Sequence, residues 1–420
     1  MTAIKTIKFN TKNIQRDILL PLSKSFCNRQ LMIYSYAGWD INELEISTAD
    51  DSVLLQSILL EIEENEQQNS IISSKEIYCK NAGTVTRFIL PYMLTKSKEY
   101  ILKGSDRMQK RPIMPLLNSL VKNGGKIKSI ANDNSLPFKI SSSKLNSHNI
   151  EIDISESSQF ASAILMMLPS QYSSSKLLLK GDLSSMPYII LTLEIMKLYG
   201  VDYKINGREI LLNGRYQKSK NIVNPERDWS SASYFYELIA MKGKGELLLR
   251  DLQLDSLQGD SILADVFVGL GVESTQTDYG VLIKANNKIN YNQNIDFNDI
   301  PDLAPAIICS CAAIGVIGKF TGLQSLNHKE SRRMDVLCAE LDKLAYDLRD
   351  NGFGEYLLLN SCKVDKSKRD FSEITINTAN DHRMAMAFAP FAIIGKSINI
   401  SDPESVEKSF PDFWGELCNC

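Results

Sequence analysis

The amino-acid sequence repeats a pair of helical patterns at intervals close to 70 residues, and this repeat sets the strongest limit on the fold. Apolar residues at helical spacing predict first helices that begin at Lys24, Thr84, Ser157, Trp229, Pro301 and His382. These starts are 60, 73, 72, 72 and 81 residues apart. The second helices are predicted to begin near Asp51, Ile113, Pro187, Gly259, Ser331 and Val406. Such a period indicates internal duplication of one supersecondary unit.

Short strands lie between the predicted helices. Alternating apolar and polar residues predict a hairpin at Tyr203–Leu212 and strand pairs at Lys126–Ile140 and Val272–Ala285. Each repeat is therefore predicted to run strand, helix, strand, helix and hairpin. Six such units are too many for one core, so we expect two lobes of three units. A linker is predicted near residues 221–226, where Pro225 interrupts the pattern.

Charge and hydropathy exclude several classes of protein. Lys and Arg number 47 against 50 Asp and Glu, so the net charge of −3 gives no overall basic field to attract nucleic acid. The uncharged apolar stretch 303–318 has 16 residues, fewer than the roughly 20 that span a bilayer. The first ten residues alternate in polarity and predict a strand instead of a signal peptide. We therefore expect a cytoplasmic protein without a membrane partner.

Cysteine and histidine are poorly placed for a metal site. The eight cysteines form no Cys-x-x-Cys pair and several stand in apolar runs, which favours free thiols. The three histidines, His148, His328 and His382, stand in separate segments. A dedicated site of His and Cys ligands is therefore not expected.

The starts of the first helices share hydroxyls, carboxylates and cations. They are Ser23-Lys24-Ser25, Gly83-Thr84-Val85-Thr86-Arg87, Ser157-Ser158-Gln159, Asp228-Trp229-Ser230-Ser231, Pro301-Asp302 and Asp381-His382-Arg383. Unpaired N–H groups and the positive dipole end make a helix N-terminus an anion site. Ser, Thr and Asp at these positions are also explained as helix caps. Cations are unfavourable there, however, so their presence indicates that an external anion neutralises them.

More cations follow the helix starts: Arg107, Arg111, Lys329, Arg333 and Lys408. Each of them is also explained as a solvated surface charge. Gly83 would let the backbone approach a ligand closely. The spacing of a Walker loop is absent, so ATP binding is not indicated.

Asp302 and Glu330 are the candidates for acid–base chemistry. Asp302 stands between Pro301 and a long apolar helix, so partial burial is predicted to raise its pKa. An N-cap for Asp302 and an exposed charge at a helix start for Glu330 are the alternatives. Spacing alone favours these alternatives.

Eight ordered motifs between about residues 21 and 413 carry a resemblance to a known family. They are Ser23-Lys-Ser25, Asn81-Ala-Gly-Thr-x-x-Arg87, Arg107-Met-x-x-Arg111-Pro-Ile, Ser157-Ser-Gln-Phe160, Ser230-Ser-Ala-Ser-Tyr-Phe235, Ile300-Pro-Asp302, Lys329-Glu-Ser-x-Arg333 and Asp381-His-Arg-Met-Ala-Met386. In this order they closely resemble the 5-enolpyruvylshikimate-3-phosphate synthases.

The resemblance implies an α/β fold, namely a two-lobed inside-out α/β barrel of six βαβαββ units, three per lobe. The N-terminal lobe would span 21–225, and the C-terminal lobe 226–420 with a first strand from residues 1–20. The implied enzyme transfers the enolpyruvyl (carboxyvinyl) group of phosphoenolpyruvate to the 5-hydroxyl of shikimate 3-phosphate and releases phosphate. This reaction belongs to the shikimate pathway of aromatic amino acid biosynthesis. A monomer without metal or organic cofactor is implied, and glyphosate is expected to compete with phosphoenolpyruvate.

The resemblance also assigns roles to residues. Shikimate 3-phosphate would contact Lys24, Ser25, Arg29, Ser157, Ser158, Gln159, Ser185, Tyr188, Asp302 and Lys329. Phosphoenolpyruvate would contact Lys24, Gly83, Arg111, Gln159, Arg333, Arg383 and Lys408. Asp302, assisted by Lys24, would take the proton from the attacking hydroxyl. Glu330 would protonate the methylene carbon of phosphoenolpyruvate, and His382 would support the site by hydrogen bonding.

The chain departs from the family's common pattern without losing a proposed catalytic group. The departures are Lys80 and Arg227 in place of Gly, Phe88 in place of Pro, Met186 in place of Lys, and Arg332 in place of Asp. Two other classes of protein are alternatives to this family. One is an enolpyruvyl transferase of the same fold that acts on a UDP-amino sugar, but the reactive Cys of that family is missing from residues 105–115. The other is a non-catalytic anion-binding relative, which the retained charged residues disfavour.

Overall fold

The two helices of each repeat differ in how much of their surface is apolar. Nearly every residue is buried in α3 (Gly83–Leu94), α6 (Gln159–Gln171) and α10 (Ala304–Ile314). By contrast, α2 (Asp50–Gln67) buries one stripe at helical spacing. A helix that is apolar all round must be enclosed, whereas an amphipathic helix covers the core with one face. First helices therefore form the interior, and second helices lie at its border.

The computed structural model describes residues 3–9, 15–68, 74–131, 135–219, 223–359 and 370–418. The chain divides into two compact units. Unit 1 consists of Met1–Ser23 and Glu226–Cys420, and unit 2 of Lys24–Pro225.

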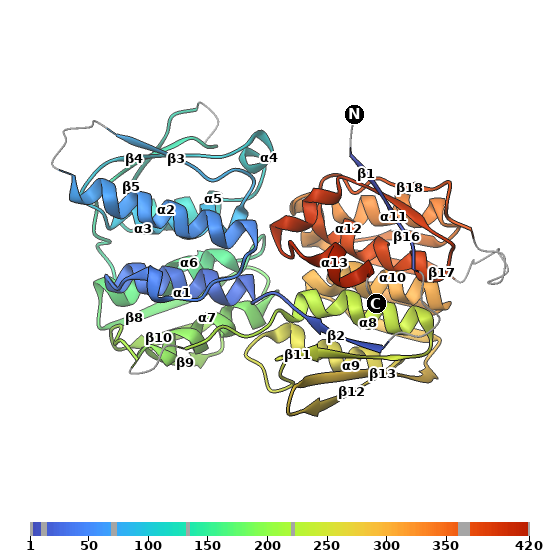
Figure 1. Cartoon of the computed structure of the whole chain (residues 1–420). Coiled ribbons are helices and arrows are strands. Elements are labelled where there is room, and N and C mark those ends of the chain that lie inside the picture. Colours follow the sequence, from blue (N-terminus) through green and yellow to red (C-terminus); the bar gives the residue numbers. More distant parts are fainter. Residues whose placement is uncertain are drawn as a thin grey trace. The chain divides into compact units, whose positions relative to one another are not determined.

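Unit 2 contains two four-stranded sheets of the same topology, in the orders β3-β4-β6-β5 and β7-β8-β10-β9. In each, the first two strands are parallel and the last two form an antiparallel hairpin. The longer helices of unit 2 lie between these sheets (Figure 1). The further elements are α1 (Lys24–Ala37), β3 (Lys75–Tyr78), β4 (Tyr100–Lys103), α4 (Asp106–Gln109), α5 (Met114–Lys122), β5 (Lys126–Ser129), β6 (Phe138–Ser141), β7 (Asn149–Asp153), β8 (Ser174–Lys180), α7 (Met186–Leu198), β9 (Asp202–Asn206) and β10 (Glu209–Asn213).

Unit 1 contains sheets in the orders β12-β13-β11-β2, β14-β15-β17-β16 and β1-β19-β18. Strands β1 (Ile4–Ile7) and β2 (Gln15–Leu19) come from the N-terminal segment, and β2 pairs in parallel with β11. The other elements are α8 (Trp229–Lys242), β11 (Glu246–Arg250), α9 (Leu263–Val268), β12 (Leu270–Thr277), β13 (Gly280–Ile289), β14 (Asn292–Asp296), β15 (Ile317–Thr321), α11 (Arg333–Lys343), β16 (Asp347–Gly352), β17 (Glu355–Leu359), β18 (Thr375–Ile376), α12 (His382–Phe388), β19 (Ile398–Ser401) and α13 (Phe413–Cys418).

The predicted pairing of helices is confirmed, and α1, α8 and α12 begin at the predicted residues. The three predicted strand pairs are also confirmed. At two predicted second helices, the residues Gly259–Ile262 and Pro403–Lys408 form 3-10 turns instead, and the α-helices α9 and α13 begin later. Among the described residues, three repeats are continuous βαβαββ units. The repeat of α8 and α9 takes β2 from the N-terminal segment as its first strand, and the repeat containing α1 and α2 has no strand of its own among the described residues.

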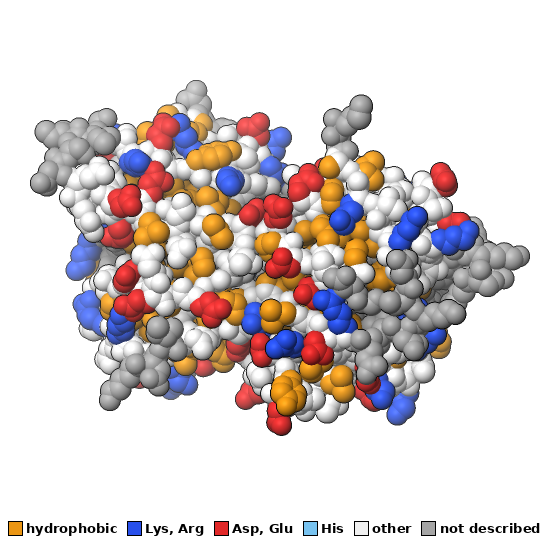
Figure 2. Space-filling model, in the orientation of Figure 1, with side chains coloured by type: hydrophobic (Ala, Val, Ile, Leu, Met, Phe, Trp, Pro, Cys, Tyr) orange, Lys and Arg blue, Asp and Glu red, His pale blue; other side chains and the backbone are white. Residues whose placement is uncertain are grey.

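Surface charge, cysteine state, helix hydropathy and possible metal ligands were each predicted from the sequence. On the face in Figure 2, cations and anions are interspersed. The six described cysteines are free thiols, and Cys362 and Cys420 lie outside the described residues. Within the same ranges, no helix has the length and apolar composition needed to cross a bilayer, and no cluster of His, Cys, Asp and Glu could hold a metal ion.

Glu237 is a carboxyl group in the core of unit 1. It lies on α8 with its side chain fully buried, and neither carboxyl oxygen has a hydrogen-bond partner among the described residues. Burial raises the pKa of Glu237 well above its usual value, because the interior disfavours the charged form. The folded protein therefore holds this proton at pH values where the unfolded chain releases it.

Glu237→Gln is expected to stabilise the protein increasingly as pH rises. Below about pH 4.3, the usual pKa of Glu in the unfolded chain, Glu237 is protonated in both states. At higher pH only the unfolded chain releases the proton, so the free energy of unfolding of the parent falls by about 1.4 kcal/mol per pH unit until Glu237 ionises in the folded state. Thermal unfolding at pH 5, 6.5 and 8 measures the difference. Glu273→Gln on the exposed face of β12 is the matched control. A pH-independent difference would contradict the raised pKa.

Candidate functional site

Most of the predicted site residues of unit 2 lie at or near the N-terminal ends of α1, α3, α6 and α7, while Arg111 lies between α4 and α5. Lys24 is the first residue of α1, and its Nζ lies 3.3 Å from Oδ2 of Asp51 in the first turn of α2. The Asp51 carboxylate is buried. The chain itself thus supplies an anion beside the Lys24 ammonium, which sequence alone did not indicate.

Gly83 and Arg111, both predicted to contact the same ligand, touch each other. A Cβ atom at Gly83 would lie 2.6 Å from Cζ of the Arg111 guanidinium, so a larger residue there would require this guanidinium to move. Nη1 of Arg111 donates to the backbone oxygen of Asn81 at 3.1 Å, and the side chain is buried. The sequence predicted that a ligand would lie close to the backbone at Gly83. In the structure, the Arg111 guanidinium occupies part of this space.

Gln159 connects the starts of α3 and α6. Its Oε1 accepts a hydrogen bond from Nη1 of Arg87 at 2.7 Å, and its Nε2 donates to Oγ1 of Thr84 at 2.9 Å. The Arg87 guanidinium also lies 5.2 Å from the ring centroid of Phe160. Oγ of Ser157 accepts a hydrogen bond from the Gln159 backbone N–H at 3.3 Å, and Ser158, the N-cap residue of α6, makes no side-chain cap bond. The amide of Gln159 is thereby held in one orientation.

Arg29 lies deeper than the other predicted ligands of unit 2, with only 2% of its surface exposed. Burial lowers the pKa of its guanidinium to about 10, with a smaller raising effect from Tyr188, so the group stays protonated at neutral pH. Nη1 donates to the Ser25 backbone oxygen at 2.8 Å, and Nη2 donates to that of Tyr188 at 3.0 Å. Arg29 thus joins α1 to α7.

Two non-glycine residues near these helix starts adopt left-handed backbone conformations. Ser185, directly before α7, has φ of 58°, and Lys80, close before α3, has φ of 51°. This region favours glycine because it has no Cβ atom. The glycine that the resemblance leads one to expect at Lys80 would adopt this conformation without strain. The remaining candidates of unit 2 are the buried Ser158 and the half-buried Arg107 of α4.

Arg333 is the centre of the predicted site residues of unit 1. Nε donates to Oδ2 of Asp381 at 2.9 Å, Nη1 to Oδ1 of Asp302 at 3.1 Å, and Nη2 to Oε2 of Glu330 at 2.7 Å. Its side chain is 1% exposed. Burial alone would lower the pKa of Arg333, but the three carboxylates outweigh burial and raise it. The planar fork of donors allows one arginine to hold all three.

The prediction that burial raises the pKa of Asp302 is wrong. Burial does act in that direction, but Arg383, Lys329 and Arg333 together outweigh it and hold the pKa well below its usual range. Nη2 of Arg383 donates to Oδ2 of Asp302 at 3.0 Å, and Nζ of Lys329 lies 3.6 Å from Oδ1. Asp302 is therefore a carboxylate at neutral pH.

Glu330 and the Asp381-His382-Arg383 segment complete this cluster. Oε1 of Glu330 lies 3.1 Å from Nζ of Lys408. Asp381 caps α12 by accepting the Arg383 backbone N–H at 3.0 Å. The buried His382 imidazole places Nδ1 3.5 Å from Oδ1 of Asp381. In unit 1 the structure thus brings together Asp302, Lys329, Glu330, Arg333, His382, Arg383 and Lys408, all of which the resemblance had assigned.

Three residues that the sequence left without a role hold the predicted ones: Asp51, Arg87 and Asp381. Each belongs to a helix start or to its first turns, where sequence alone favours a helix cap or a surface charge. A buried charge needs a partner of opposite sign or a polar contact, but the sequence does not show which charges become buried.

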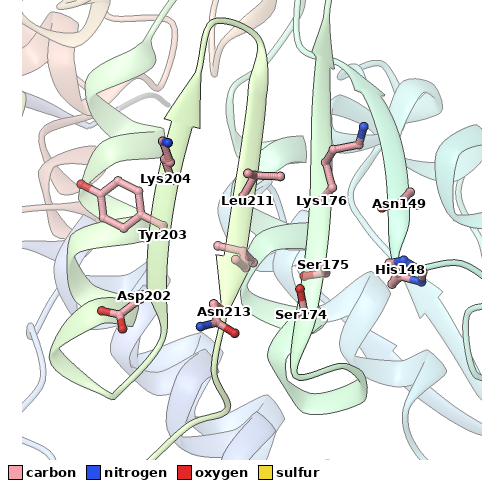
Figure 3. A pocket seen from close by; sticks show the side chains of 11 residues that line it. His148, Asn149, Ser174, Ser175, Lys176, Asp202, Tyr203, Lys204, Leu211 and Asn213 are labelled. Carbon is pink, nitrogen blue, oxygen red and sulfur yellow. The ribbon is translucent and has the colours of Figure 1, made fainter.

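A separate hollow of about 580 Å³ lies on the exposed face of the sheet β7-β8-β10-β9 (Figure 3). Lys176, Lys204, Leu211 and Asn213 are among its lining residues. Lys176 is already paired with Glu209 at 2.9 Å. The described lining includes none of the predicted site residues, so this hollow does not belong to the candidate site.

Fold and side chains together define an α/β protein of repeated βαβαββ units, with Lys and Arg gathered at helix starts suited to anionic small molecules. A family model for EPSP synthase (3-phosphoshikimate 1-carboxyvinyltransferase) matches residues 50–417. The chain belongs to the EPSP synthase family, which confirms the resemblance carried by the motifs.

Individual relatives agree with the family match. A 3-phosphoshikimate 1-carboxyvinyltransferase of Bacteroides fragilis (strain YCH46) is 35% identical over 410 residues, covering 96% of this chain and 95% of the relative. One from Vibrio vulnificus (strain YJ016) is 29% identical over 425 residues, covering 97% of each chain. A solved EPSP synthase structure from Acinetobacter baumannii superposes with a TM-score of 0.73 at 19% identity, covering 100% of this chain and 98% of that one. The structural likeness supports the fold.

Proposed function

We propose that this protein transfers the enolpyruvyl group of phosphoenolpyruvate to the 5-hydroxyl of shikimate 3-phosphate and releases phosphate. Family membership supports the reaction. The single structural observation that carries the proposal is the cluster in which the carboxylates of Asp302 and Glu330 share the guanidinium of Arg333. Such a cluster combines groups for proton transfer with cations for binding anions, as a reaction between two phosphorylated acids requires.

The cations are proposed to bind the phosphate and carboxylate groups of the two substrates. The proposed contacts of shikimate 3-phosphate are Lys24, Ser25, Arg29, Ser157, Ser158, Gln159, Ser185, Tyr188, Asp302 and Lys329. The proposed contacts of phosphoenolpyruvate are Lys24, Gly83, Arg111, Gln159, Arg333, Arg383 and Lys408. Arginine suits the bidentate recognition of these groups, and lysine acts on them as a point charge.

Substrate binding gives Asp302 the basicity that its environment otherwise removes. Arg383, Lys329 and Arg333 lower its pKa, and the same three cations are proposed to bind substrate anions. Once those anions share the positive charge, the pKa of Asp302 rises, and the carboxylate accepts the proton of the attacking hydroxyl with help from Lys24. Glu330 protonates the methylene carbon as the hydroxyl oxygen bonds to the neighbouring carbon, and it takes a proton back from the resulting methyl group as the bond to phosphate breaks. His382 supports the site.

The finer architecture also belongs to this proposal. The two units correspond to the two lobes of an inside-out barrel of six βαβαββ units, with β1 and β2 contributed by the N-terminal segment. The enzyme is a cytoplasmic monomer that needs no metal or organic cofactor. Glyphosate, a small phosphonate-carboxylate, competes with phosphoenolpyruvate.

Phosphate release tests the proposed function directly. Purified protein is expected to release phosphate when both shikimate 3-phosphate and phosphoenolpyruvate are present, and none with either substrate alone. Release with phosphoenolpyruvate and a UDP-amino sugar would assign the chain to the alternative transferase. Binding of both anions without any phosphate release would make it a non-catalytic relative.

Gly83→Ala is expected to raise the KM for phosphoenolpyruvate about tenfold or more. The added methyl group would overlap the Arg111 guanidinium, which must move by roughly 1 Å, and displacements of that size in a binding group are costly. Steady-state kinetics with each substrate varied in turn measures the effect. Gly415→Ala is the control, because a Cβ atom there meets no atom within 4 Å. An unchanged KM would show that Arg111 does not bind this substrate.

A further inference from the structure

Thr192 lies at the centre of a buried polar network between three helices of unit 2. Its side chain, on α7, is fully buried. Oγ1 accepts a hydrogen bond from Nε of Arg29 on α1 at 2.7 Å and donates to the Tyr188 backbone oxygen at 2.9 Å. It also lies 2.8 Å from Oγ of Ser162 on α6. A threonine hydroxyl has one proton and two lone pairs, so these three contacts use all of its hydrogen-bonding capacity if Ser162 donates.

The same network fixes the plane of the Arg29 guanidinium. Nη2 contacts Ser162 Oγ at 3.4 Å and the Tyr188 backbone oxygen at 3.0 Å. From α3, the Phe88 ring lies with its centroid 5.6 Å from Cζ of Arg29. Nη1 uses one N–H for the Ser25 backbone oxygen. Four of the five N–H groups therefore have acceptors among the described residues, and the second N–H of Nη1 has none there.

We propose that Thr192, supported by Ser162, is a positioning residue for shikimate 3-phosphate. It holds the guanidinium of Arg29 in the orientation that presents the remaining N–H of Nη1 to the substrate. This inference rests on the proposed function, which assigns Arg29 to shikimate 3-phosphate. An arginine held in advance binds its ligand more tightly, because less side-chain freedom is lost on binding.

Thr192→Val tests the proposal with a substitution of nearly the same shape. Valine removes the acceptor of the Arg29 Nε–H, and a buried donor without an acceptor will favour other guanidinium orientations. The KM for shikimate 3-phosphate is expected to rise about tenfold, with kcat and the KM for phosphoenolpyruvate within about twofold of the parent. Thr192→Ser keeps the hydroxyl and is expected to restore the parent KM.

Thr86→Val is the matched control. Thr86 is also a fully buried helical threonine of unit 2 and bonds the backbone oxygen four residues earlier, that of Ala82, at 2.9 Å. Unlike Thr192, Thr86 accepts no hydrogen bond from an arginine among the described residues. Its substitution is expected to leave the ratio of the two KM values unchanged. If Thr192→Val fails to fold, Ser162→Ala provides the test, with a smaller rise of about threefold in the same KM.

A double-substitution cycle separates positioning from a general loss of packing. In an Arg29→Lys background, which lacks the Nε–H, Thr192→Val is expected to change shikimate 3-phosphate binding by less than twofold. Calorimetric titration with shikimate 3-phosphate alone measures this binding without turnover. Equal effects in both backgrounds would overturn the positioning role.

The remaining outcomes distinguish this inference from the function on which it rests. A parent protein that releases no phosphate from the two substrates overturns the proposed function and the inference with it. An active parent overturns the inference alone if Thr192→Val leaves the KM for shikimate 3-phosphate unchanged, or if it raises both KM values equally.

Discussion

Arg333→Met is expected to lower the free energy of unfolding of unit 1 by about 3–5 kcal/mol, because it leaves buried carboxylates without their cation. Asp381 has no exposed surface, and its Oδ2 accepts from Nε of Arg333 at 2.9 Å. Asp302 and Glu330 each lose a hydrogen-bond donor as well. Methionine fills a similar volume, so the loss reports on charge more than on a cavity. Urea unfolding, followed by tryptophan fluorescence, measures the change.

The neighbouring residue provides the control for this substitution. Arg332 also pairs with an aspartate, Asp335, but its side chain is 67% exposed. Exposed pairs contribute about 0–1 kcal/mol, so Arg332→Met is expected to change stability by less than that. Equal losses for the two variants would show that the Arg333 cluster does not hold unit 1 together.

Asp302→Asn and Glu330→Gln are each expected to slow turnover by about 10²-fold or more while the protein stays folded. The loss of a positioned general acid or base usually lowers the turnover rate by about this factor. Both amides keep the shape of the parent side chain and can still accept a hydrogen bond from Arg333. Shikimate 3-phosphate binding should remain measurable, because the other proposed contacts are unchanged. Single-turnover measurements at saturating substrate separate the chemical step from binding.

Asp296→Asn, an exposed carboxylate at the end of β14, is the control for these two variants. It is expected to retain the turnover of the parent. If Asp302→Asn or Glu330→Gln also turns over within a few-fold of the parent, the acid–base role assigned to that residue is wrong.

Much of the fold could be predicted because its signals are local. Apolar residues at helical spacing located α1, α8 and α12 at their first residues, and alternating polarity located the hairpin of β9 and β10. The first residue of a second helix was predicted wrongly where a 3-10 turn precedes the α-helix, as at Gly259–Ile262. Both conformations begin with similar residues, and the surrounding packing selects between them.

The candidate site was predictable only in its list of residues. Motifs identified Lys24, Asp302 and Arg333, since the residues of a motif are neighbours in the sequence. They did not identify Asp51, which contacts Lys24 from another helix, or Thr192, which contacts Arg29 from another helix.

The pKa of Asp302 shows most clearly where sequence stops and tertiary structure decides. The sequence determined the repeat, the helix starts and the charges that those starts carry, because each depends on residues a few positions apart. Whether Asp302 becomes more or less acidic depends on Arg383, which is 81 positions away in the chain yet donates to its carboxylate at 3.0 Å. Electrostatic energy varies with the distance between charges and with the solvent that folding removes from between them. Only the folded chain sets those two quantities.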